Sequence, residues 1–308
     1  MLALLYCRTP TLSPQDARAS LPAMCASDSV ASRRPVLQRT LTSRRSLLAQ
    51  SAALAALSRR RVASAADSSV ILEQCRDEMG INGGYLQPCM TDRQRAFDFN
   101  QPVGRVMIEQ GPLGPSATGE VVWNSAPLLA DYEARVLGPS FFKGKRVLEL
   151  GCGTALPSIV ASKLGAASVL ATDGSIEVCR RAERNVALNC AVSANAAAGG
   201  IGCRQLFWTA NGMLDGDFER SFDVVLAADV LWILSGQSQL AATAKAALKP
   251  DGVFLLAETG HDGLALPQAL SNFRAIAEGV GLKWEGTESL PLQVDGYDAQ
   301  VVEMRLRG

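Results

Sequence analysis

The chain of 308 residues has little of several residue types, and each shortage narrows the range of functions. It contains one histidine, and none of its eight cysteines forms a C-x-x-C pair or a Cys/His cluster with metal-ligand spacing. We therefore expect no metal site. The weakly apolar run Leu47–Leu57 is shorter than the roughly 20 residues that a membrane-spanning helix needs, and no other segment qualifies. We expect the mature protein to be soluble and not to enter a membrane.

Acidic residues are almost absent from the first 66 positions, which hold ten arginines but only Asp16 and Asp28 as acids. This composition, rich in Arg, Ser and Ala, is typical of an organellar targeting presequence over residues 1–66. Arg44 and Arg45 precede a weakly apolar run, and Ala63–Ala65 matches an A-x-A cleavage signal, so the segment resembles a two-part presequence with a twin-arginine signal. We expect a chloroplast protein of the stroma or the thylakoid lumen, with a mitochondrial transit peptide as the alternative.

The rest of the chain has the opposite charge balance, with 20 basic and 28 acidic residues. A negatively charged body argues against a nucleic-acid partner. Hydrophobic residues make up 48% of the sequence, which is ample for a buried core. We divide the body into an N-terminal extension and lead-in segment over 67–138 and a catalytic domain over 139–308. Residues 67–100 are polar, and we expect one short helix there (69–79) and loops.

Hydrophobic periodicity divides the body into strands and helices. The expected strands cover 104–110, 147–150, 168–172, 204–208, 222–227, 252–257, 283–289 and 299–306, and the expected helices cover 123–137, 157–164, 175–189, 239–248 and 267–280. Alternating strands and helices predict an α/β fold, a doubly wound seven-stranded sheet with helices on both faces. Because no helix separates the last two strands, we expect them to form an antiparallel hairpin at the C-terminal edge of the sheet.

A strand, a glycine turn and a helix follow one another from Arg146 onward, and this arrangement indicates a cofactor site. Gly151 and Gly153 permit a sharp turn and a close approach of the backbone to a ligand. Pro157 stands where a helix begins, a position that tolerates its missing N–H. Asp173 ends the next strand, where a carboxylate can accept both hydroxyl groups of a ribose. A tight structural turn is the alternative reading of the glycines alone.

The residues around this turn favour one class of cofactor. The pattern from Gly151 to Ala155 is G-x-G-x-A, not the G-x-G-x-x-G of dinucleotide enzymes, and Glu149 precedes the first glycine by two positions. In this the segment resembles the first motif of the seven-strand S-adenosylmethionine-dependent methyltransferases, which have a Rossmann-like fold. The third glycine of that motif is Ala155 here, and we expect a slightly tighter fit rather than loss of the cofactor.

Four further segments resemble one family within that class, the methyltransferase-like protein lysine methyltransferases. They occur in the family's order. The segments are the lead-in Thr118–Tyr132, the N-x-x-x-N of Asn185–Asn189, the L-x-W of Leu206–Trp208, and Ala227–Trp232, in which Asp229 lies three residues before an aromatic side chain. That aromatic residue is Trp232, where the family usually has Tyr or Phe.

The resemblance implies a function and a set of site residues. The cofactor would be S-adenosylmethionine, and the partner a protein that offers a lysine. In the catalytic step Asp229 would hold the amine and Trp232 would flank it by cation–π attraction. The residues implied in cofactor binding are Trp123, Glu149, Gly151, Cys152, Gly153, Asp173, Trp208 and Ala228. A small-molecule N-methyltransferase and an inactive methyltransferase-like binding protein remain open, as do the acceptor, the degree of methylation and the oligomeric state.

Overall fold

The computed structural model of the protein describes residues 92–112, 118–190, 200–212, 216–259, 265–289 and 299–307. The expected presequence (1–66) and the expected short helix (69–79) lie outside these residues.

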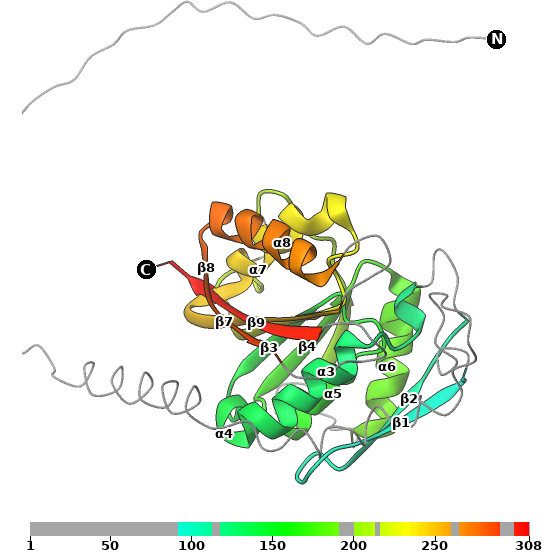
Figure 1. The fold of residues 1–308 in the computed structure, drawn as a ribbon. Coiled ribbons are helices and arrows are strands. Elements are labelled where there is room, and N and C mark those ends of the chain that lie inside the picture. Colours follow the sequence, from blue (N-terminus) through cyan, green and yellow to red (C-terminus); the bar gives the residue numbers. More distant parts are fainter. Residues whose placement is uncertain are drawn as a thin grey trace, which may run out of the picture. The chain divides into compact units, whose positions relative to one another are not determined.

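A seven-stranded sheet forms the centre of the described fold (Figure 1), in the order β5-β4-β3-β6-β7-β9-β8. The strands β5, β4, β3, β6 and β7 are parallel to one another, whereas β9 runs antiparallel to both β7 and β8. The strands are β3 (Arg146–Leu150), β4 (Ser168–Asp173), β5 (Ile201–Gln205), β6 (Phe222–Ala228), β7 (Leu248–Thr259), β8 (Leu282–Ser289) and β9 (Ala299–Leu306). The predicted fold class and the antiparallel edge hairpin are confirmed. The strand order reverses between β3 and β6, the place where open α/β sheets bind ligands.

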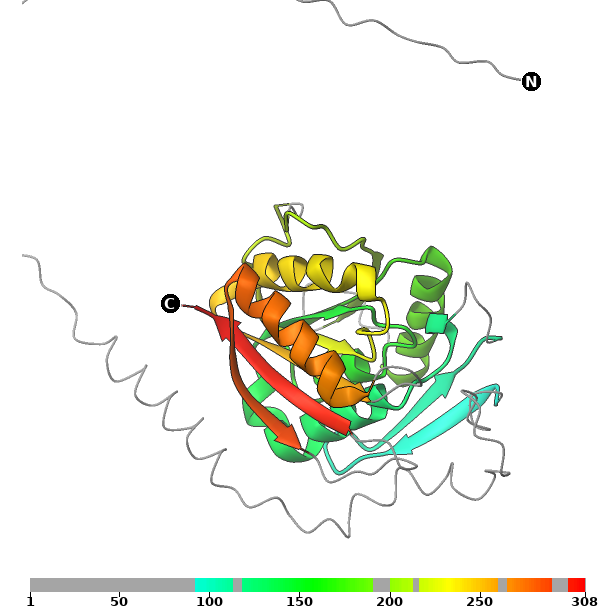
Figure 2. The ribbon, with the colours of Figure 1, turned by 45° about the horizontal axis from the view of Figure 1, so that its top comes forward.

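Helices cover both faces of the sheet (Figure 2). On one face lie α3 (Ser125–Asp131), α5 (Leu156–Lys163) and α6 (Ile176–Asn189), and on the other lie α7 (Gln237–Ala247) and α8 (Leu266–Val280). Alternate residues of each strand enter the two cores. In β3, for example, Val147 packs among the residues of the first face and Leu148 among those of the second. This alternation follows from the pleat of a strand that is buried on both faces.

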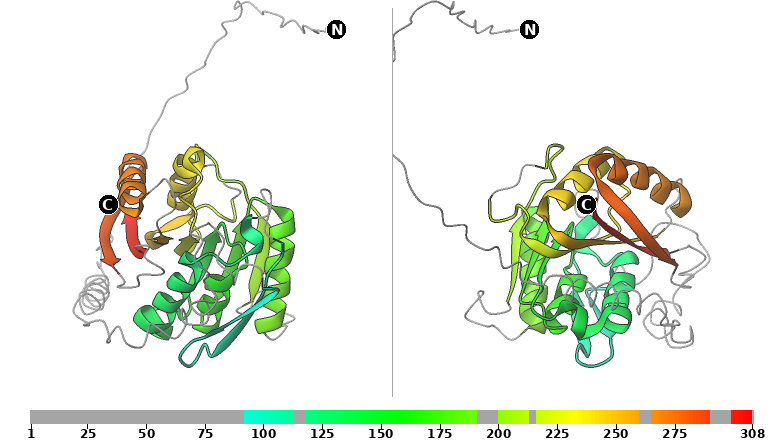
Figure 3. Two further views of the ribbon diagram at one scale, coloured as in Figure 1. Left: turned by 45° about the vertical axis from the view of Figure 1, so that its right-hand side comes forward. Right: turned by 90° about the vertical axis from the view of Figure 1, so that its left-hand side faces the viewer.

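A two-stranded hairpin lies beside α6 and outside the main sheet (Figure 3). It consists of β1 (Gln94–Asp98) and β2 (Arg105–Glu109), whose Val106 and Ile108 are fully buried against the first core. The strand at Gln94–Asp98 corrects the expectation of helix and loops over 67–100. Its QRAFD sequence lacks apolar alternation and so did not indicate a strand. Pairing with β2 and burial of Phe97 define this strand.

The expected helix over 123–137 is broken into pieces. A short 3-10 turn, η2 (Thr118–Glu120), precedes α3, which starts only at Ser125. The helix then widens into a π-helical turn, η3 (Tyr132–Leu137), and continues as α4 (Gly138–Phe142). Trp123 therefore lies in the segment before the helix rather than within it.

Two strand boundaries also differ from those expected. The third strand of the sheet is Ile201–Gln205 rather than 204–208, so Trp208 lies in the loop beyond the strand. Pairing with β4 sets this boundary, since Ile201 lies opposite Val169 and Gln205 opposite Asp173. β7 extends at both ends beyond the expected 252–257. Within the described part of the chain, no helix has the length and apolarity needed to cross a bilayer.

Candidate cofactor and acceptor site

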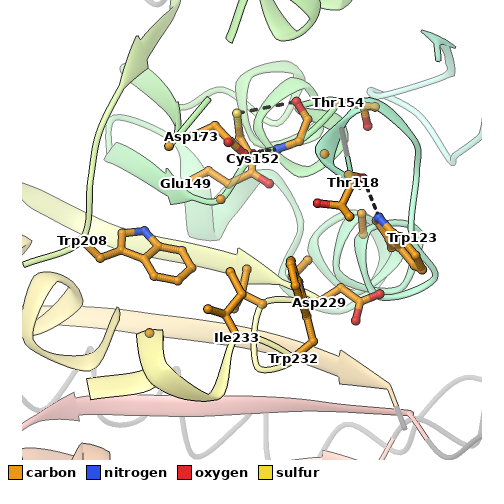
Figure 4. Close-up of a pocket in the computed structure, with 18 of the residues that line it drawn as sticks. Thr118, Trp123, Glu149, Cys152, Thr154, Asp173, Trp208, Asp229, Trp232 and Ile233 are labelled. Carbon is orange, nitrogen blue, oxygen red and sulfur yellow. Dashed lines mark hydrogen bonds between the residues drawn. The ribbon is translucent and has the colours of Figure 1, made fainter. Parts of the chain in front are cut away.

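A cavity of about 390 Å³ lies at the carboxyl ends of β3, β4 and β6 (Figure 4). This volume falls within the range of roughly 300–1,000 Å³ that is usual for small-molecule sites. Three of the segments that line it are the glycine turn (residues 151–155), the lead-in wall (residues 118–123) and the acceptor turn (residues 229–233). Figure 4 shows Asp173 and Glu149 on one side of the cavity and Asp229 and Trp232 on the other.

The glycine turn adopts left-handed backbone conformations, which are unfavourable for residues that have a side chain. Gly151 and Gly153 have φ angles of 72° and 49°, and Ala155, which has a side chain, still adopts a φ of 65°. A Cβ atom on Gly151 would lie 3.0 Å from Val230 Cγ1, and one on Gly153 would lie 3.2 Å from the Gly119 carbonyl oxygen. The two glycines therefore allow the turn to lie close to both the acceptor turn and the lead-in wall.

Glu149 is a buried carboxyl at the end of β3. Its Oε2 accepts hydrogen bonds from the Ser158 N–H (3.0 Å) and from the Ser158 hydroxyl at the start of α5. Burial raises the pKa of Glu149 to about 8, the Ser158 hydrogen bonds oppose the shift, and the charge of Asp173 adds to it. Burial therefore favours the protonated form of Glu149 near neutral pH.

Asp173 ends β4 and its carboxylate already shapes the glycine turn. It accepts hydrogen bonds from the N–H groups of Gly153 (3.2 Å) and Ser175 (3.0 Å), while burial raises its pKa. A carboxylate offers about four acceptor positions, so these backbone bonds leave capacity for a ligand's hydroxyl group. Cys152, between the glycines, is buried, and its N–H bonds the carbonyl of Thr172.

The lead-in wall is fixed from two sides. The Trp123 indole N–H donates to the Thr118 carbonyl at 2.8 Å, which closes this wall on itself. Glu120 forms a part-buried ion pair with Arg181 of α6 at 2.7 Å. These contacts hold the side of the cavity that faces the glycine turn.

The acceptor turn follows β6 and presents a carboxylate and an aromatic ring. Asp229 is 7% exposed with a φ of 58°, a left-handed conformation that Asp and Asn adopt more readily than other side chains. Ala228 lines the cavity at the end of β6, and Trp208 lies close to Gly151. Trp232 is 50% exposed at the cavity's edge.

The structure brings all ten residues implied by the resemblance to the wall of this one cavity. Their roles remain predictions. Three residues that support the site were not among them: Ser158, which holds Glu149, and Glu258 and Gln237, which hold the acceptor turn. Ser158 stands one position after Pro157 and carries a weak helix-start signal, but nothing in the sequence connects Glu258 with the turn.

The ionisable acids and bases that line the cavity, among the residues the structure describes and apart from Cys152, are Glu149, Asp173 and Asp229, and all three are carboxyl groups. Such a cavity favours cations and repels phosphates. Within the described residues, no group of three or more His, Cys, Asp and Glu side chains is arranged to hold a metal ion.

Residues 106–262, just over half of the chain, match the family model described as lysine methyltransferase. The chain belongs to the lysine methyltransferase family. It is 29% identical over 170 residues to the calmodulin-lysine N-methyltransferase of Arabidopsis thaliana, covering 53% of this chain and 49% of that protein. It is 34% identical over 140 residues to the protein N-terminal and lysine N-methyltransferase EFM7 of Gibberella zeae, covering 42% of this chain and 52% of that protein. The chain thus spans about half the length of these relatives.

Among solved structures, the ribosomal protein L11 methylase of Lactobacillus delbrueckii subsp. bulgaricus aligns with a TM-score of 0.41 and 23% identity, covering 59% of this chain and 77% of that one.

Family membership implies S-adenosylmethionine as the cofactor, and the residues present fit it. The positive φ angles of Gly151 and Gly153 and the lack of a Cβ at both keep the glycine turn close to the acceptor turn and the lead-in wall, so its backbone lines the cavity. Glu149 suits the ammonium and sulfonium charges of this cofactor, and Asp173 suits its ribose hydroxyl groups.

Proposed function

We propose that the protein is an S-adenosylmethionine-dependent methyltransferase that acts on the amine of a lysine side chain in a protein. The observation that carries the proposal is the arrangement of acids around one cavity, with Glu149 and Asp173 near the glycine turn and Asp229 on the acceptor turn. Both a sulfonium cofactor and a lysine are cations. The two relatives, a calmodulin-lysine N-methyltransferase and a protein N-terminal and lysine N-methyltransferase, support the same reaction.

When bound, S-adenosylmethionine supplies an electrophilic methyl group. The residues of the chain would do the rest. Glu149 and Asp173 would hold the cofactor, and the glycine turn and the lead-in wall would exclude water from it. Asp229 directs the incoming amine by a charge-assisted hydrogen bond, and Trp232 covers it with an aromatic face. Only the neutral amine has a lone pair to donate. Burial in the cavity would lower the pKa of the lysine and favour that form, whereas the charge of Asp229 would oppose this shift.

The test compares the full chain with Asp229→Asn, which keeps the shape and the left-handed backbone of Asp229 but removes its charge. Each protein is incubated with S-adenosylmethionine that carries a radiolabelled methyl group and with a protein extract, and labelled residues are identified by mass spectrometry. We expect label on lysines with the native chain and at least about a 100-fold lower rate with the variant. Label on small molecules alone would instead favour a small-molecule N-methyltransferase, and cofactor binding without label would favour an inactive binding protein.

We also propose that residues 1–66 direct the protein to the chloroplast, to its stroma or thylakoid lumen. The arginine-rich, acid-poor composition and the pair Arg44–Arg45 support this. Fusion of residues 1–66 to a fluorescent protein tests it. If the native fusion reaches the thylakoid lumen, replacement of both arginines by lysine should keep it in the stroma. Accumulation of the native fusion in mitochondria would contradict the proposal.

A further inference from the structure

The acceptor turn (residues 229–233) is held by two buried side chains that lie outside it in the sequence. The N–H groups of Val230 and Leu231 both donate to Oε2 of Glu258, each at 3.2 Å. The carbonyl of Leu231 accepts from Nε2 of Gln237 at 2.8 Å. Glu258 is fully buried near the end of β7, and Gln237 is buried at the start of α7.

The backbone of the turn explains why a carboxylate is needed there. Because Asp229 is left-handed, the next two N–H groups point the same way and form a small concavity of the kind that binds anions. The Glu258 carboxylate fills it. The Asp229 N–H bonds the neighbouring Ala257 carbonyl at 3.0 Å, so the end of β7 fixes three successive N–H groups of the turn.

These bonds control what faces the cavity. Asp229 opens the turn and Trp232 lies next to Leu231, whose N–H and carbonyl are both held. Val230 is also the closest neighbour of the position that a Gly151 Cβ would occupy, so the acceptor turn lies close to the glycine turn. The geometry of the acceptor side thus depends on Glu258 and Gln237.

We infer that Glu258, assisted by Gln237, is a positioning residue for the acceptor amine: it fixes the turn that carries Asp229 and Trp232. The inference rests on the proposed function for its role in methyl transfer. It separates two groups of residues, since the proposed cofactor residues Glu149 and Asp173 lie on β3 and β4, whereas Glu258 lies on β7.

The experiment uses the full chain with Glu258→Ala, Glu258→Gln and Gln237→Met. A glutamine oxygen can still accept from both N–H groups, whereas alanine leaves them unsatisfied. We expect Glu258→Ala to lower kcat for methyl transfer to protein by about 10- to 100-fold with little change in the Kd for S-adenosylmethionine. Glu258→Gln should retain most of the native kcat. Gln237→Met should lower kcat less than Glu258→Ala does. Glu278→Ala, on the exposed ion pair with Arg274 of α8, is the matched control and should change neither quantity.

A second readout does not depend on catalysis. Acrylamide quenching of Trp232, isolated by comparison with Trp232→Phe in each background, reports the position of the turn. Glu258→Ala should change this quenching and Glu258→Gln should not. If the native chain transfers no methyl group to protein, the proposed function fails. The quenching measurement alone then tests whether Glu258 fixes the position of the turn. Unchanged kcat and quenching in Glu258→Ala would overturn the inference. The inference would also be overturned if Glu258→Gln lost as much kcat and as much cofactor affinity as Glu258→Ala. If Glu258→Ala does not fold, an unaltered kcat and quenching in Gln237→Met would overturn it.

Discussion

At the scale of single residues, the protonation of Glu149 makes cofactor binding depend on pH. Its pKa of about 8 means that the free protein carries a proton there at neutral pH. A cationic cofactor favours the ionised form, so binding at pH 7 should release about one proton. Calorimetric titration in buffers of different ionisation enthalpy measures this release. Glu149→Gln should release none, and no release from the native chain would contradict the assignment of Glu149 to the cofactor.

The same group has a consequence for stability in the absence of ligand. Because the folded pKa of Glu149 is raised above its value of about 4.3 in an unfolded chain, the folded state binds more protons than the unfolded state. Its contribution is therefore fully present below about pH 4.3 and is lost as the pH rises through about 8. The buried carboxyl of Glu133, whose pKa burial also raises, acts with the same sign. In urea titrations, Glu149→Gln should reduce the fall in the free energy of unfolding between pH 5 and pH 8. An unchanged fall would contradict the raised pKa.

Gly153 offers a test of close approach in the glycine turn. A Cβ there meets a backbone oxygen of the lead-in wall, whereas a Cβ on Gly144, also at a positive φ (76°), meets nothing within 4 Å. Both Gly→Ala changes should cost about 1–2 kcal/mol of stability from the left-handed backbone. Only Gly153→Ala should also weaken binding of S-adenosylmethionine. Equal affinities of the two variants would show that contact with the wall is unimportant.

At the scale of elements, two asparagines of α6 hold the edge of β2 as a neighbouring strand would. Asn189 accepts from the Met107 N–H at 2.8 Å and donates to its carbonyl, and Asn185 does the same with Glu109. Asn185 alone also donates to the carbonyl of Thr154 in the glycine turn, at 3.1 Å. The hairpin is thereby connected to the cofactor side of the cavity.

This difference makes the two asparagines a matched pair. Replacing either by alanine leaves polar backbone groups unsatisfied and should cost about 1–3 kcal/mol of stability, measured by urea denaturation. Asn185→Ala should in addition weaken cofactor binding, measured by calorimetry on the folded protein. Weakening of equal size in Asn189→Ala would mean that the Thr154 contact carries no specific effect.

The elements that the sequence predicted well are those with a strong local pattern. The apolar strands β3, β4 and β6 and the amphipathic helix α6 were placed within one or two residues, and the lack of a helix between the last two strands predicted their pairing. β1 was missed because its QRAFD sequence has no alternation and only its pairing defines it. The π-helical turn at Tyr132–Leu137 was missed because helix periodicity does not reveal a local change of hydrogen bonding.

The candidate site also contains residues that could be predicted from the sequence and residues that could not. Glu149, Asp173 and Asp229 were predictable because they end buried strands, and the carboxyl ends of parallel strands meet at one edge of the sheet. Glu258 was not predictable, and the N-x-x-x-N segment did not indicate what Asn185 contacts. Each acts on a segment far away in sequence, 27 to 28 residues for Glu258 and 76 for Asn185 and Glu109. Such contacts leave no periodic signal, and only the folded chain brings the partners together.

At the scale of the whole molecule, one core joins the lead-in segment to the sheet. Buried residues from Phe97 to Leu137 share a hydrophobic cluster with Val147 of β3 and Val224 of β6. The lead-in wall is therefore part of the folded body, and the cavity that it closes should exist before the cofactor binds. The acidic charge of the body agrees with the acids of the cavity, and both favour cationic ligands.

The most direct test of the central claim is a calorimetric titration of the full chain with S-adenosylmethionine, beside Asp173→Ala. We predict saturable binding of one cofactor per chain, lost in the variant while its urea denaturation still shows a cooperative transition. Absence of binding to the folded native chain, or equal affinity in Asp173→Ala, would contradict the placement of the cofactor in this cavity.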